Sequence, residues 1–220
     1  METIKLLRRE LDPSVAVIGF SGAPFTLAGY LIEGKPSREF LATKTMMYAQ
    51  PALWDALMIR LSGLVLDYLL AQVKAGAQVV QVFDSWVGCL SPADYRRYVL
   101  PHMAGIFSGL LRGGAPAIHF GTGAAGILSL MKEAGGDVIG LDWRVDLGEA
   151  WRMIGYDSGI QGNLDPALLL GPWPVIEDGA RRLIEAAGGR PGHIFNLGHG
   201  VLPNTPVERL QRLVEFVHGV

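Results

Sequence analysis

Short apolar runs alternate with longer segments along the whole sequence, and this alternation limits the fold more than any other feature. The short runs are rich in β-branched residues, which is typical of strands in a parallel sheet. In the longer segments apolar residues recur every three or four positions, which indicates amphipathic helices. The sequence therefore predicts an α/β fold with strands at 15–20, 79–83, 117–120, 138–141, 159–162 and 193–196. The run 159–162 is weak as a strand by propensity, and the rhythm of the chain places it.

Six strand–helix units are visible in the sequence, whereas a closed (β/α)8 barrel has eight. If the chain is of the TIM-barrel type, it holds about six of the eight units. No linker or low-complexity segment divides the chain, so we interpret residues 1–220 as a single domain, a partial barrel.

Capping residues mark the expected helix boundaries. The longest amphipathic segment covers 53–74. Ser91-Pro92 and Thr205-Pro206 each combine a hydroxyl that can cap a helix with a proline that suits the first turn. Several expected helices end in the glycines that favour a C-terminus, namely Gly76, Gly113, Gly114, Gly135, Gly136, Gly188 and Gly189.

The charge balance excludes several classes of protein. Lys and Arg number 19 against 21 Asp and Glu, so the basic surface typical of nucleic-acid binding is absent from the sequence. A single cysteine, Cys89, excludes an internal disulfide and suits a reducing cytosol. The first residues carry charges and lack the apolar region of a signal peptide. Two charge-free stretches, 14–32 and 113–131, are interrupted by glycines and a proline, so we expect a soluble, cytoplasmic protein rather than a membrane protein.

Polar residues gather where the expected strands end. Ligands and catalytic groups lie at the carboxyl ends of strands in barrels and doubly wound sheets alike. Each of the six strand ends has polar groups next to small residues or turn formers, at 21–24, 84–86, 121–123, 142–144, 161–166 and 196–200. This arrangement favours a pocket over a structural rim, although it names no reaction.

Five motifs at these ends resemble the uroporphyrinogen decarboxylase family. They are GFSGAPFTLAGYLIEG at 19–34, FDSWVGCLSP at 83–92, GLDW at 140–143, QGNLDP at 161–166 and FNLGHGVLP at 195–203. Each motif is weak alone. Together they occur in the order of that family and at compatible spacing, from about residue 5 to the C-terminus.

The resemblance implies a (β/α)8 barrel that dimerises at full length and uses no cofactor or metal. It also implies decarboxylation of the four acetate side chains of uroporphyrinogen III to give coproporphyrinogen III, in the synthesis of haem or chlorophyll. Protonation of a pyrrole carbon turns the ring into an electron sink for the departing CO2. The protein must then stabilise a pyrrole cation and hold carboxylates in a dry pocket. No nucleic acid or membrane partner is expected.

The same resemblance assigns roles to five residues. Tyr30 matches a pocket tyrosine that donates to a substrate or catalytic carboxylate, and it is the catalytic candidate. Ser85 and His199 match donors to substrate carboxylates, and Phe20 and Phe83 would form apolar walls against the macrocycle. Outside these motifs, the same residue types are more often a core tyrosine, a turn serine, a structural histidine and core phenylalanines.

Three aspartates in the motifs receive other interpretations. No motif gives Asp84 a catalytic role, so we interpret it as a structural partner. Asp142 and Asp165 are expected to fix the loops in which they lie, behind the residues that touch substrate.

Two features of the family are not found in this sequence. The early segment of the family holds an arginine-rich loop for substrate carboxylates and an aspartate that faces the pyrrole NH groups. Neither motif occurs here, so the chain corresponds to the C-terminal two-thirds of such a protein. Because cation stabilisation is the largest catalytic effect, we expect the isolated chain to be inactive or nearly so.

A dinucleotide-binding oxidoreductase is one alternative. Residues 121–126 read GTGAAG, a GxGxxG pattern after an expected strand, and Asp142 follows near the ~20-residue spacing of that fingerprint. Two strand–helix units precede the pattern, however, whereas the fingerprint normally opens its domain. This reading also leaves the other strand-end motifs unexplained.

Zinc-dependent methyltransferases of the same superfamily, which act on corrinoids and thiols, are a closer alternative. Those relatives use a His-x-Cys pair and a later cysteine as zinc ligands. Here His119 is followed by Phe120 and Gly121, the later region offers His199, and Cys89 alone cannot supply the thiolates.

A non-catalytic porphyrinogen-binding protein is the alternative from a different class. It would have kept the fold and lost the catalytic segment. The sequence alone does not separate this reading from a partial decarboxylase, although the presence of Tyr30, Ser85 and His199 favours the decarboxylase.

Overall fold

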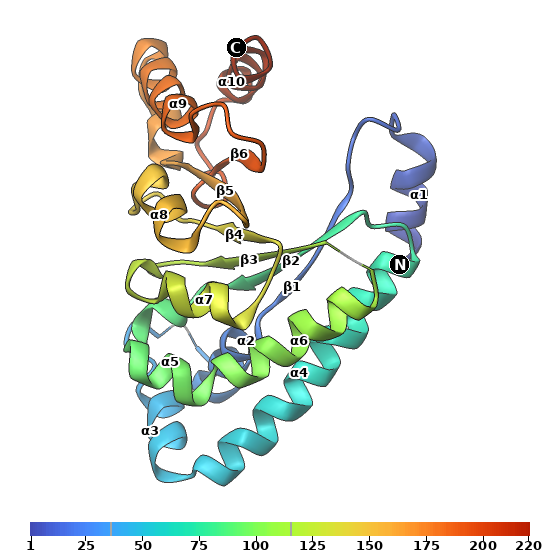
Figure 1. The fold of residues 1–220 in the computed structure, drawn as a ribbon, viewed down its shortest axis with the longest axis vertical. Coiled ribbons are helices and arrows are strands. Elements are labelled where there is room, and N and C mark those ends of the chain that lie inside the picture. The colour runs from blue at the N-terminus through green and yellow to red at the C-terminus, as the bar shows by residue number, and fades with distance from the viewer. Residues whose placement is uncertain (36, 115) are drawn as a thin grey trace. The chain divides into compact units, whose positions relative to one another are not determined.

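The computed structural model describes residues 1–35, 37–114 and 116–220. The chain divides into two compact units, Met1–Asp137 (unit 1) and Val138–Val220 (unit 2). Each unit consists of three parallel strands with helices packed against them, as Figure 1 shows. The predicted α/β class with parallel strands is therefore confirmed. The interpretation of the chain as one domain stays a prediction.

In unit 1 the strands pair in the order β1-β2-β3. They are β1 (Ile18–Gly22), β2 (Val79–Asp84) and β3 (Ala117–Gly121). The helices are α1 (Glu2–Glu10), α2 (Pro24–Glu33), α3 (Leu41–Ala49), α4 (Pro51–Lys74), α5 (Pro92–Tyr98), α6 (Leu100–Arg112) and α7 (Leu128–Ala134), with short 3-10 turns η1 (Val87–Cys89) and η2 (Ala125–Ile127).

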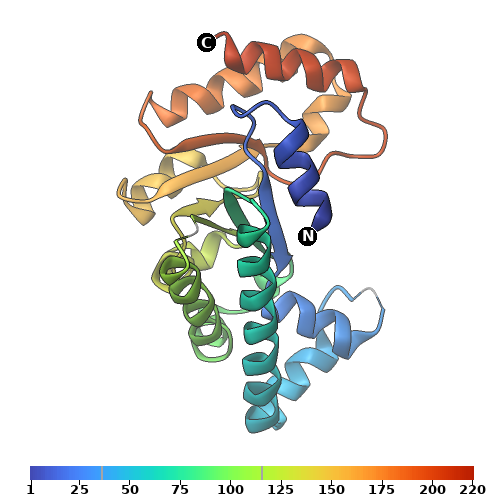
Figure 2. The same cartoon turned by 90° about the vertical axis from the view of Figure 1, so that its right-hand side faces the viewer.

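The long helix α4 organises unit 1, where it runs beside α6 and also packs on α2 and β1 (Figure 2). Its buried face begins at Trp54, whose Nε1 donates to the carbonyl of Tyr98 at 3.0 Å. Near its end the Gln72 amide donates to the Phe20 carbonyl and accepts from the Phe20 N–H, both at 2.8 Å. A side chain thus satisfies backbone groups of β1 that no strand pairs.

Among the described residues, α4 is the one helix that is long and apolar enough to cross a membrane by length and composition. The core helix of a soluble protein passes the same test. In the described residues, the charge-free stretches 14–32 and 113–131 each contain a strand followed by a loop and the start of a helix.

In unit 2 the strands pair in the order β4-β5-β6. They are β4 (Val138–Gly140), β5 (Gly159–Leu164) and β6 (His193–Leu197). The helices are α8 (Leu147–Ile154), α9 (Trp173–Ala187) and α10 (Val207–His218), with a 3-10 turn η3 (Pro166–Leu170). A core of buried apolar side chains joins β5, α9 and α10, formed by Leu164, Leu169, Ile176, Ala180 and Leu213.

All six predicted strands exist, and their bounds differ in detail. The first begins at Ile18 rather than at residue 15, and the weak fifth run is a full strand that extends to Leu164. Ser91 caps α5 as predicted, because its hydroxyl accepts from the Asp94 N–H at 3.1 Å. The matching prediction for Thr205 is wrong. Pro206 is the N-cap residue of α10, and the buried Thr205 hydroxyl has no partner among the described residues.

Candidate functional site

Tyr30, the catalytic candidate, lies on α2 in unit 1. The helix begins at Pro24, which suits a first turn, and ends at Gly34, whose φ of +62° favours glycine. The Tyr30 side chain is 58% exposed, and its ring meets the Trp86 ring edge-on, with centroids 6.1 Å apart. Trp86 in turn packs on Phe40 at 5.5 Å. These three rings help to line a cavity of about 430 Å³, so the Tyr30 phenol stands beside a hollow.

Phe20 and Phe83 lie in an aromatic row that crosses the three strands of unit 1. The Phe20 and Phe83 centroids are 5.8 Å apart, and those of Phe83 and Phe120 are 5.5 Å apart, both edge-on. Phe120 is buried, whereas Phe20 is 61% exposed. The exposed ring of Phe20 is therefore accessible to a ligand, as the predicted wall requires.

Ser85 directly follows β2, where its carbonyl accepts from the Thr122 hydroxyl. That bond fixes the backbone of Ser85 and leaves its side chain half-buried. Within the described part of the chain the Ser85 hydroxyl makes no hydrogen bond, so this donor is available directly after a strand.

Asp84 is a feature that the sequence interpretation underrated. Its side chain is fully buried at the end of β2, and its Oδ1 accepts from the Thr26 hydroxyl on α2 at 2.9 Å. Its Oδ2 has no partner within the described residues. Burial raises the pKa of Asp84 to about 7, and the Thr26 bond opposes this shift only in part. Asp84, which the sequence interpretation treated as a structural partner, is therefore a carboxyl group whose pKa lies near neutral pH. The sequence signal for it is an acidic residue at the end of a buried strand.

In unit 2 the GLDW motif forms a turn after β4. The Asp142 Oδ1 accepts from the Arg144 N–H at 3.0 Å, and its Oδ2 accepts from Arg144 Nη1 at 2.6 Å. Asn163 on β5 donates from Nδ2 to the carbonyls of Asp142 and Val145, each at 2.7 Å. Asp165 likewise accepts from the Ala167 N–H at 2.9 Å. These bonds agree with the loop-fixing roles expected for the two aspartates.

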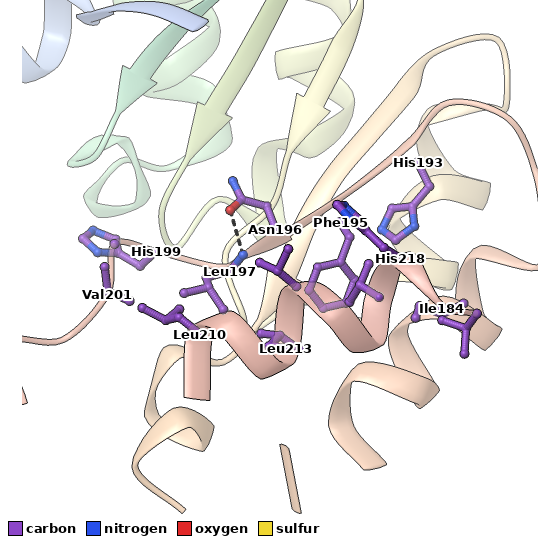
Figure 3. A pocket seen from close by; sticks show the side chains of 14 residues that line it. Ile184, His193, Phe195, Asn196, Leu197, His199, Val201, Leu210, Leu213 and His218 are labelled. Atoms are coloured by element: carbon purple, nitrogen blue, oxygen red, sulfur yellow. Dashed lines mark hydrogen bonds between the residues drawn. The ribbon is translucent and has the colours of Figure 1, made fainter. Parts of the chain in front are cut away.

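His199 follows β6 and is exposed. Its ring meets Trp143 edge-on, with centroids 6.3 Å apart. Gly198 explains this contact, because a Cβ at that position would lie 2.9 Å from the Trp143 Cα. His199 also stands at one end of an apolar groove of about 720 Å³ between β6 and α10, with His193 toward the other end (Figure 3).

The glycine-rich segment 121–126 has a packing role in the structure. Gly121 ends β3, and η2 follows before the seven-residue α7. A Cβ added at Gly88 would lie 2.8 Å from the Gly123 backbone, so η1 is packed on the loop where a dinucleotide would have to approach. This contact and the φ of +63° at Gly123 account for Gly88 and Gly123 without a cofactor.

His119 lies inside β3 and is fully buried. Its Nδ1 is 3.3 Å from the Met131 carbonyl and 3.2 Å from the Gly135 carbonyl, so this nitrogen carries the hydrogen. Burial lowers the pKa of His119 to about 4. Within the described ranges, no group of three or more His, Cys, Asp or Glu side chains could hold a metal ion.

Of the five predicted site residues, Phe20, Tyr30, Phe83 and Ser85 lie in unit 1 and His199 lies in unit 2. The structure pairs Phe20 with Phe83 and seats Tyr30 on Trp86, the residue after Ser85. The sequence interpretation assigned no role to Thr26, Trp86 or Arg144, although Trp86 and Arg144 lie in the polar stretches 84–86 and 142–144 that it singled out. Thr26 and Trp86 fall inside quoted motifs, whereas Arg144 follows one directly.

Comparisons with known proteins agree with the motifs. The family model described as Uroporphyrinogen decarboxylase (URO-D) matches residues 1–220. A uroporphyrinogen decarboxylase of Carboxydothermus hydrogenoformans is 54% identical over 99% of the chain and 62% of the relative. One of Thermus thermophilus is 54% identical over 100% and 64%. The chain thus spans less than two thirds of the length of these relatives.

The solved structures show the same fold. A methyltransferase from Methanosarcina mazei superposes with a TM-score of 0.83 over 99% of this chain and 63% of its own. At 24% identity this likeness shows the fold alone. The shared architecture is that of an incomplete barrel of the TIM type.

Proposed function

Because the chain belongs to the uroporphyrinogen decarboxylase family, we propose that it forms part of a carboxy-lyase that converts uroporphyrinogen III to coproporphyrinogen III. The observation that carries this proposal is the position of Tyr30, the tyrosine of the family motif. The Tyr30 ring contacts Trp86 edge-on beside a cavity, and most of the tyrosine is exposed. A phenol in this setting can donate to a substrate carboxylate.

The other site residues suit a large, flat and highly carboxylated substrate. Ser85 offers a hydroxyl at the end of β2, and His199 offers an imidazole at the end of β6. Phe20 and Phe83 present aromatic rings to the apolar macrocycle. Neutral donors hold a carboxylate without the strong attraction that would oppose its loss as CO2, so they suit a decarboxylase better than lysines would.

During the reaction two protons are added in turn, and one proton is released at the end. A proton first adds to a pyrrole carbon, and the resulting cation accepts the electron pair left when the C–C bond to the carboxylate breaks and CO2 departs. A second proton then converts the methylene carbon to a methyl group, and the ring proton is lost. In our proposal Tyr30, Ser85 and His199 hold and orient the carboxylates during these steps. In the whole protein, the aspartate implied by the family resemblance would stabilise the cation, and the arginine-rich loop would bind substrate carboxylates.

We further propose that the whole protein is a cytoplasmic homodimer that needs no cofactor and binds neither nucleic acid nor membrane. The near balance of 19 basic and 21 acidic residues supports the absence of a nucleic-acid partner. The shared family and the single cysteine support the other statements.

Titration of the 220-residue chain with uroporphyrin I, a stable oxidised analogue, tests the substrate class. We expect saturable quenching of porphyrin fluorescence, and the Tyr30→Phe variant should bind about fivefold more weakly because one hydrogen bond to a charged group is lost. Tyr68→Phe is the matched control, since Tyr68 is an exposed tyrosine on α4 in the same unit. Absence of binding by the unaltered chain would contradict the proposal.

A further inference from the structure

Arg144 is an oriented cation that no motif-based role explains. Its guanidinium lies over the Trp143 ring, with Cζ 4.0 Å from the ring centroid, while Nη1 bonds the buried Asp142 carboxylate. The side chain is nevertheless 53% exposed. A guanidinium has five N–H donors in a rigid fork, so its outer donors stay available while one edge and one face are fixed.

Three consecutive strands of unit 2 hold this cation in place. β4 ends in the turn that carries Arg144, and Asn163 on β5 bonds the carbonyls on either side of Trp143 and Arg144. Gly198 directly follows β6, and its close approach to the Trp143 backbone places the His199 ring against the same indole. The GLDW, QGNLDP and NLGHG motifs therefore converge on one small region in which Arg144 and His199 both contact Trp143.

The turn itself does not require the guanidinium. The Asp142 carboxylate already closes the turn by accepting from the Arg144 N–H at 3.0 Å, and this bond needs no contribution from the guanidinium. The added pairing through Nη1 instead selects one orientation of a long, flexible side chain. Preorganisation of this kind lowers the entropic cost of binding a ligand.

We propose that Arg144, together with His199, binds a carboxylate side chain of the substrate, with Trp143 as the platform that positions both groups. This inference rests on the proposed function and names a specificity-determining residue within it. Carboxylates suit the fork of arginine, and an imidazole edge supplies a further donor. Arg144 would supply this chain with a cation for the substrate, in addition to the neutral donors Tyr30 and Ser85.

The test is titration of the 220-residue chain with uroporphyrin I at low ionic strength. We expect Arg144→Gln to weaken binding about tenfold, because a charge-assisted contact is lost. The affinity of Arg144→Lys should lie between those of the unaltered chain and Arg144→Gln. The dependence of affinity on salt should also become shallower in Arg144→Gln. Arg152→Gln is the matched control, since Arg152 is an exposed arginine on α8 of the same unit, and it should stay within about twofold of the unaltered chain.

Loss of Arg144 could destabilise the chain by leaving the Asp142 carboxylate buried without its cation. The double variant Asp142→Asn/Arg144→Gln removes this charge while an amide oxygen still accepts the backbone N–H, and it should fold and also bind about tenfold more weakly. If both variants fold and bind as the unaltered chain does, the role of Arg144 is refuted and the proposed function stands. If the unaltered chain fails to bind uroporphyrin I, both proposals fail.

Discussion

Replacement of Asp84 by asparagine should change how the stability of the chain depends on pH. Asp84 is fully buried, and its pKa is raised from 3.8 to about 7 by desolvation. Between these two values the folded chain binds more protons at this site than the unfolded chain does. Stability must therefore fall as pH rises through that window. Asparagine keeps an oxygen to accept from Thr26 and cannot ionise.

The size of the effect follows from the two pKa values. Between pH 5 and pH 8 the ionisation of Asp84 should cost the native chain about 2.5 kcal/mol of stability. The Asp84→Asn variant does not incur this cost. Its free energy of unfolding should therefore rise by that amount relative to the unaltered chain over the same interval.

Urea denaturation of both proteins at several pH values measures this difference directly. Asp67→Asn, which alters an exposed aspartate on α4 of the same unit, is the control. Its difference from the unaltered chain should stay within about 0.5 kcal/mol across the range. A flat Asp84→Asn difference between pH 5 and pH 8, with unchanged urea m-values, would refute the reasoning.

The stability of the unaltered chain, measured alone, would conceal the effect of Asp84 ionisation, because the titration of His119 changes stability with pH in the opposite direction. Its folded pKa of about 4 lies below the ordinary value of 6.5, so stability is lost as pH falls between these values. From pH 4 to 6.5 the gain at His119 offsets much of the loss at Asp84. Only a difference between variants separates the two groups.

The remaining two predictions use the same denaturation measurement. His119→Gln should lose about 2 kcal/mol less than the unaltered chain between pH 7.5 and pH 5, because the titrating group is gone, and equal losses would contradict the pKa assigned to His119. Gly88→Ala should destabilise the chain by about 2 kcal/mol or more, since its Cβ would lie 2.8 Å from the Gly123 backbone. Gly63→Ala on α4, where nothing lies within 4 Å, should instead stabilise it by about 0.5 to 1 kcal/mol, and similar effects at both sites would argue against the contact.

The alternation of strand and helix is predictable because it follows from hydrophobic period, which is a local property. The same holds for the Ser91 cap, which needs only its own helix. Thr205 shows the limit of such reasoning, since the same residue pattern there leaves a hydroxyl without a partner and a proline as N-cap. The conformation that a cap requires depends on how the preceding loop is held. The first strand begins later than its apolar run for a similar reason, because pairing with β2 starts at Ile18.

In the candidate site, too, some features follow from local sequence and others depend on contacts with residues distant in the sequence. Its motifs lie at strand ends in the sequence, so their gathering at one edge of each set of strands was expected. The orientation of Arg144 was not expected, because it depends on Asn163 in β5 and on Gly198 directly after β6. A sequence pattern can show that a cation is present at a strand end, but tertiary bonds decide whether it is held there.

Asp84 and Ser85 show how the two kinds of cause meet. They are adjacent, but Asp84 is the fully buried last residue of β2, whereas Ser85 follows the strand and is half-buried. The buried residue, Asp84, bonds Thr26 on α2, four positions before Tyr30 on the same helix. One buried bond thus ties the helix that carries Tyr30 to β2, the strand that Ser85 directly follows. Two proposed substrate donors, 55 positions apart in sequence, are therefore coupled through a carboxyl that resemblance alone left without a role.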